Sequence, residues 1–146
     1  MGYPLAIVIL ALGISQCQMA AQVSAPLVFL PDKLPWVSPP NNPRLRFAWI
    51  LGNEQNTGAY LLRVRLEAQG RIQPHTHPDE RVTTVLAGTI HIGFGEEFDQ
   101  AEPTAIPAGA VYLTPANVPH YVWAGGEEVV YQEAGFGPTG TSFIKH

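Results

Sequence analysis

The sequence predicts an all-β protein, a sandwich or barrel of short strands. Fourteen prolines and fourteen glycines among 146 residues are typical of strands joined by tight turns. Beyond the N-terminal apolar run, no segment shows the 3.6-residue period of an amphipathic helix. A hydrophobic content of 46% with 14% charged residues excludes a disordered chain. The length suits a single domain with its own core.

The N-terminal residues 1–21 contain the only long apolar run of the chain, residues 5–14. Such a run is too short to span a bilayer and fits the core of a signal peptide, since small residues follow it. We therefore expect export to the periplasm or secretion, with no membrane attachment of the mature protein. The absence of Lys or Arg before the run leaves a buried N-terminal segment as the alternative. The single cysteine, Cys17, follows Gln16 rather than a small residue, which argues against a lipoprotein anchor.

Residues 22–43 are rich in proline and lack both strand and helix periodicity, so we expect an arm that lies over the domain. Its apolar side chains are the expected anchors: Leu27, Phe29, Leu34 and Trp36.

Residues 44–146 form the predicted β-domain, with eight to ten strands. The segment 60–67 alternates most clearly, with Leu62, Val64 and Leu66 on one face and arginines on the other. Short alternating or apolar segments bounded by turn residues predict strands at 45–50, 60–67, 72–77, 82–86, 89–94, 110–114, 120–123, 128–133 and 141–144.

Three histidines are the candidate metal ligands. His75 and His77 occupy alternate positions of a predicted strand, so both side chains point to the same face. His120 ends a proline-marked turn and opens another apolar segment. Three imidazoles gathered on one face could form half a coordination shell. A His-x-His pair alone is more often two surface histidines beside a Pro-rich turn, because the spacing by itself does not demand a metal.

These residues and their surroundings resemble the cupin superfamily. The resemblance rests on Gly70, His75, His77 and Gly88 for the first cupin motif and on the segment PANVPH, residues 115–120, for the second. Four residues separate Gly70 from His75, one fewer than in the motif, and Asn117 stands where glycine is usual. Asparagine is a natural substitute there because it tolerates a positive φ. The resemblance implies a double-stranded β-helix, an RmlC-like jelly-roll barrel. In detail, the chain is similar to a group of small, often exported, single-domain bacterial cupins.

The glutamate ligand of the first motif is the one clear departure. Its position falls on Arg81, which is always cationic and offers no lone pair. A shifted turn would bring Glu80 to the site as a fourth ligand; the alternatives are a three-histidine site or no physiological metal. Arg81 itself could hold a carboxylate or enolate substrate, or form a structural salt bridge to Asp79 or Glu133.

Further candidates for a substrate pocket are Arg81, Tyr112 and Gln132. A tyrosine such as Tyr112 is more often part of the core or a pocket wall than catalytic, and either Gln132 or its neighbour Glu133 could reach the pocket. His91 lies opposite two isoleucines and is expected to face solvent. A formal net charge of −4 gives no basic surface for nucleic acid.

The resemblance implies one divalent transition metal, Zn, Fe, Ni, Cu or Mn, in a barrel that receives a small organic molecule. It also implies a homodimer. The expected reactions are of dioxygenase, isomerase or lyase type. A non-catalytic ligand-binding or structural cupin is the alternative, because fold alone does not select a reaction.

Overall fold

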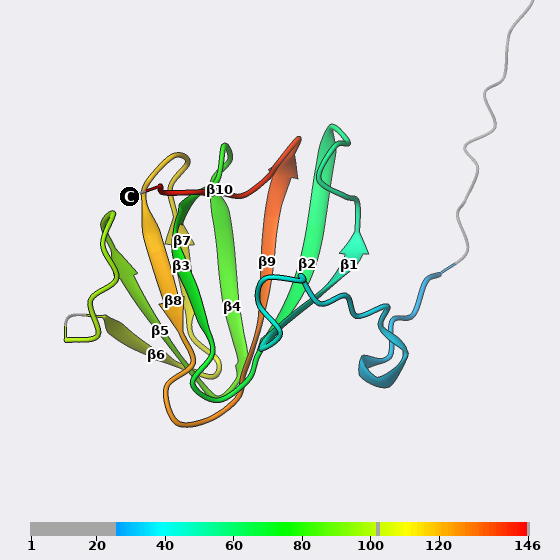
Figure 1. Ribbon diagram of the computed structural model, residues 1–146. Coiled ribbons are helices and arrows are strands. Elements are labelled where there is room, and N and C mark those ends of the chain that lie inside the picture. Colours follow the sequence, from blue (N-terminus) through cyan, green and yellow to red (C-terminus); the bar gives the residue numbers. More distant parts are fainter. Residues whose placement is uncertain (1–25, 102, 146) are drawn as a thin grey trace, which may run out of the picture.

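The computed structural model describes residues 26–101 and 103–145 (Figure 1). The predicted all-β class is confirmed: these residues form two antiparallel five-stranded sheets and one short 3₁₀ helix, η1 (Pro31–Lys33). The expected signal peptide, residues 1–21, lies outside the described residues. Among the described residues, no helix has the length and apolar character needed to cross a membrane.

The first sheet has the strand order β1-β2-β9-β4-β7. Its strands are β1 (Leu45–Leu51), β2 (Gly58–Leu66), β4 (Arg81–Ala87), β7 (Val111–Thr114) and β9 (Val129–Gly137). The second sheet has the order β10-β3-β8-β5-β6. Its strands are β3 (Arg71–Thr76), β5 (Thr89–Phe94), β6 (Thr104–Pro107), β8 (His120–Trp123) and β10 (Ser142–Phe143). The chain therefore passes from one sheet to the other between β9 and β10 (Figure 1).

The core lies between the two sheets because strand alternation directs one apolar face of each strand inward. From the first sheet, Leu62, Val64 and Leu66 on β2 are buried, as the sequence predicts. From the second sheet, Ile72 and Val122 belong to the same cluster.

One strand was missed. β6 was not among the predicted strands, yet it pairs with β5, and Ile106 lies opposite Ile90 and packs against the core. A single inward apolar side chain in a four-residue strand leaves almost no alternation to detect.

The N-terminal arm is anchored by fewer residues than expected. Leu34 is buried, and the ring of Trp36 lies 5.1 Å from the guanidinium carbon of Arg65. Leu27 and Phe29, in contrast, are exposed, so the prediction was wrong for these two residues. Further along the arm, Val37 forms a bridge with Phe47 of β1, and Pro39, Asn41 and Asn42 line the cavity described below.

Candidate metal centre

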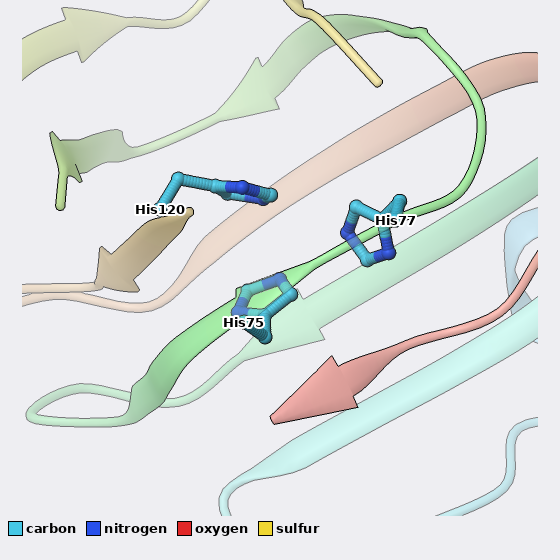
Figure 2. A group of neighbouring side chains, drawn as sticks. All are labelled: His75, His77 and His120. Carbon is cyan, nitrogen blue, oxygen red and sulfur yellow. The ribbon is translucent and has the colours of Figure 1, made fainter. Parts of the chain in front are cut away.

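The three predicted histidines come together at the ends of two paired strands. His75 lies on β3, His77 follows the last residue of that strand, and His120 opens β8 directly opposite His75. Each of the three is only 4% exposed, and their potential ligand atoms all lie within 4.8 Å of one another. Figure 2 shows the three rings pointing toward a common space. The structure thus brings His120 together with His75 and His77, from which it is distant in the sequence.

A bulge in β3 sets the direction of His75. Ile72 pairs with Val122 and His75 with His120, so Gln73 and Pro74 together stand opposite one residue of β8. The extra residue shifts the alternation of inward and outward side chains. Ile72 and His75 are therefore both buried, although they are three positions apart. Proline fits this position because it lacks a backbone N–H and bulges are among the few sheet positions that tolerate it.

A residue in the left-handed backbone conformation links the turn before His120 to the segment that carries His77. Asn117 has a φ of 60°, as expected from its place in the second motif, and its N–H donates to the carbonyl oxygen of His77 (2.7 Å). The turn that precedes His120 is therefore tied directly to the segment that carries His77.

Each ring donates a hydrogen bond from Nδ1 to a backbone carbonyl. The acceptors are Gln73 for His75 (2.7 Å), Gly140 for His77 (2.7 Å) and Val118 for His120 (2.9 Å). A carbonyl oxygen only accepts, so Nδ1 must carry the proton, and a neutral ring then has its lone pair on Nε2. Among the described residues the hydrogen bonds of these rings all involve Nδ1. The three Nε2 atoms are thus left to bind an ion.

Burial keeps the three imidazoles neutral. Desolvation lowers the pKa of His75 from 6.5 to about 4 and that of His77 to about 2, and it also lowers the pKa of His120. The positive charge of Arg81 lowers the pKa of all three, whereas the carboxylate of Glu133 raises that of His120. Neutral imidazole is the form that binds a metal, so the donor set fits a transition-metal ion without any proton being displaced near neutral pH.

Arg81 faces the interior, and both of its terminal nitrogens donate hydrogen bonds. It lines the cavity and is 4% exposed. Its Nη1 donates to Glu133 Oε2 (2.7 Å), and its Nη2 donates to Thr139 Oγ1 (2.8 Å) and to the carbonyl oxygen of Gly140 (3.3 Å). Nε lies 3.9 Å from Asp79 Oδ1. Of the two alternatives for a structural salt bridge, Asp79 and Glu133, Arg81 contacts both, and all three side chains are largely buried.

Glu80 does not join the histidines. It is exposed and lies outside the group of potential ligands, so the expected shifted turn does not occur. Strand β4 begins at Arg81, and alternation turns Arg81 inward and its neighbours outward. The expectation of Glu80 as a fourth ligand was wrong for this reason.

Asp79 organises a polar network beside the site. It accepts hydrogen bonds from the hydroxyl groups of Tyr60 and Thr139, and the guanidinium of Arg81 is its nearby cation. Burial raises the pKa of Tyr60, and the hydrogen bond to Asp79 acts in the same direction, so this phenol remains a donor.

A cavity of about 770 Å³ opens beside the histidines. Tyr112 lines it, as predicted. Gln132 does not: it lies on the other face of β9, where it accepts a hydrogen bond from Arg63 (2.5 Å). Its neighbour Glu133 lines the cavity instead. Buried Val129 and Tyr131 share the inward face of β9 with Glu133, but the apolar Val130 between them conceals this alternation in the sequence.

His91 is only partly exposed, contrary to expectation. Its ring lies 5.1 Å from that of Trp123 on the neighbouring strand, and its Nδ1 is buried without a hydrogen-bond partner among the described residues. It takes no part in the histidine group.

The cupin domain family matches residues 62–131 of this chain, a range that contains all three histidines. The two sheets and the paired histidine segments are what this match leads one to expect. The chain is a member of the cupin superfamily. No curated protein is significantly similar to this cupin in sequence.

Solved structures with the same fold include enzymes and a protein of unassigned role. The polyketide cyclase RemF from Streptomyces resistomycificus is 16% identical, with 84% of this chain and 89% of that chain covered and a TM-score of 0.66. An uncharacterised conserved protein with a double-stranded β-helix domain from Klebsiella pneumoniae is 18% identical, with coverages of 84% and 100% and a TM-score of 0.64. The DMSP lyase DddQ from Ruegeria pomeroyi is 14% identical, with coverages of 77% and 63% and a TM-score of 0.62. At these identities the likeness shows the fold alone.

Proposed function

We propose that this cupin binds one divalent transition-metal ion through the Nε2 atoms of His75, His77 and His120 and acts on a small organic molecule in the adjoining cavity. The observation that carries the proposal is the set of three Nδ1–H bonds to backbone carbonyls. These bonds fix the tautomer and the orientation of each ring, the usual arrangement around metal-binding histidines. Without a metal, three buried neutral imidazoles with unused lone pairs would have no evident purpose.

Three neutral nitrogen donors suit Zn, Fe, Ni, Cu or Mn and do not discriminate among them. A three-residue set leaves coordination positions for water or substrate, as in catalytic rather than closed structural sites. When bound, the ion would act as a Lewis acid or, if redox-active, activate oxygen. The protein residues hold the ion, exclude bulk water and shape the cavity. The reaction classes that fit this arrangement are lyase, isomerase and dioxygenase reactions, and RemF and DddQ are examples of enzymes on the same fold.

A non-catalytic ligand-binding module is the second candidate. It is favoured by the pairing of Arg81 with Glu133, because each of these cavity-lining charges neutralises the other instead of remaining free for acid–base work. Stoichiometric metal with ligand binding but no turnover, over a panel of small organic acids and ring compounds, would favour this module over the enzyme.

The test is elemental analysis of protein purified without added metal. We expect about one transition-metal ion per chain in the wild type and a more than tenfold lower content in each of His75→Ala, His77→Ala and His120→Ala. His91→Ala is the matched control, a histidine of the same sheet outside the group, and should retain the wild-type content. Equal metal in the wild type and the His75→Ala protein would refute the site.

A further inference from the structure

Building on this function, we infer that the ligand of this cupin is an amphiphilic organic anion, with a carboxylate or enolate oxygen directed to the histidine group and an apolar body in the cavity. The charge of the site and the composition of its walls lead independently to the two halves of this description.

Within the part of the chain that the structure describes, the site provides no negatively charged ligand atom. The group of potential ligands among the described residues consists of three histidines, although carboxylate oxygens would qualify equally. Arg81 and its two buried carboxylate partners, Asp79 and Glu133, form a separate ionic network beside the histidines. Its formal charges sum to −1, so a divalent ion on neutral histidines leaves a buried site with a net charge of +1. One monoanionic ligand makes this site neutral, whereas an uncharged ligand leaves the excess charge in a medium of low dielectric.

The cavity lining is more apolar than polar, which favours an apolar body for the other half of the ligand. Both sheets contribute aromatic and aliphatic side chains to the lining: Phe47, Trp49, Leu62, Val64, Val122 and Tyr131. The volume of about 770 Å³ lies in the range of sites that hold drug-sized ligands and is far larger than acetate requires. A short polar acid would leave these walls in contact with water and forgo their contribution to binding.

Calorimetric titration with matched probes tests the inference. The probes are 4-phenylbutyrate, its uncharged counterpart 4-phenylbutanol, and acetate, each titrated into zinc-loaded and metal-free protein whose zinc content is measured in the same samples. In the zinc-loaded protein we expect 4-phenylbutyrate to bind at least tenfold more tightly than either other probe. The advantage of the acid over the alcohol should vanish in the metal-free protein.

Two variants of strand β1 test whether the apolar cavity wall contributes to the affinity for the ligand. Trp49→Leu should weaken 4-phenylbutyrate at least fivefold and leave acetate unchanged. Leu51→Ala, an exposed residue of the same strand outside the cavity lining, should change neither.

The possible failures are distinguishable. Equal affinity of acid and alcohol in protein that carries its zinc would overturn the inference while the metal site stands. A protein that takes up no zinc would overturn both the proposed function and the inference.

Discussion

His77 and Arg81 share one hydrogen-bond acceptor, the carbonyl oxygen of Gly140. His77 Nδ1 lies 2.7 Å from this oxygen and Arg81 Nη2 lies 3.3 Å from it. Arg81 also binds the preceding residue, Thr139, through the same nitrogen. The arginine thereby holds the segment that crosses between β9 and β10 and, through it, the orientation of a metal-binding ring.

This relationship predicts that Arg81 tunes the metal site without contacting the ion. Arg81→Gln removes the bonds that fix the carbonyl of Gly140, and we expect the affinity for zinc to fall about 10- to 100-fold, the range typical of residues that orient metal ligands. Competition with a chromophoric chelator measures the affinity of the folded protein. Arg63→Gln is the control, because Arg63 also bonds a strand β9 side chain, Gln132, but on the face away from the cavity. An unchanged affinity in Arg81→Gln would show that Gly140 is held without the arginine.

The buried pair of Arg81 and Glu133 predicts a specific pattern of stability. Arg81→Met leaves a carboxylate buried without its cation and should lower the free energy of unfolding by about 3–5 kcal/mol. Adding Glu133→Gln removes that carboxylate, so the double variant should be more stable than Arg81→Met. Urea unfolding of the metal-free proteins gives the values. A double variant whose loss equals the sum of the single losses would contradict direct coupling between the two side chains.

Asn117 should be replaceable by glycine and not by alanine. Its φ of 60° costs most side chains roughly 1–2 kcal/mol, and glycine adopts it freely. Asn117→Gly is therefore expected to keep both stability and metal content, whereas Asn117→Ala should lower the free energy of unfolding by about 1 kcal/mol. Thermal and urea unfolding of the two variants compare them directly. Equal stability of the Gly and Ala variants would mean that the left-handed turn does not form.

Acid should destabilise the metal-free protein through its histidines. The folded-state pKa of His75 is about 4, below the ordinary 6.5. Between these two values the unfolded chain binds a proton at this histidine and the folded protein does not. Stability is therefore lost as the pH falls from about 6.5 toward 4. Between pH 7 and pH 4.5 this histidine alone should remove about 2 kcal/mol.

The matched control for this titration is His75→Asn, which lacks the titrating ring but retains every acidic residue. Urea unfolding at both pH values should show a smaller loss of stability in this variant than in the wild type. Identical losses in the two proteins would assign the acid sensitivity to other groups.

The sequence was sufficient for the elements that depend on local pattern. Alternation identified the inward face of β2, and the spacing of His75 and His77 with the turn before His120 identified the three histidines. The positive φ of Asn117 followed from its place in the turn. These are properties of a few consecutive residues and can be read without knowing how distant strands pair.

Features that depend on long-range register were not predictable in this way. The choice between Gln132 and Glu133 required the phase of β9, and the choice between Glu80 and Arg81 required the residue at which β4 begins. The partners of Arg81 at Thr139 and Gly140 come from a crossing segment whose path the sequence does not indicate. β6 contributes one inward apolar side chain, too little to produce a strand signal.

Anomalous diffraction from crystals of zinc-loaded protein tests the central claim most directly. The account predicts a single zinc peak at about 2.0–2.1 Å from the Nε2 atoms of His75, His77 and His120, with each Nδ1 still bonded to its backbone carbonyl. A zinc ion bound through Nδ1, a zinc ion located elsewhere on the protein, or the absence of a peak at the three histidines would contradict it.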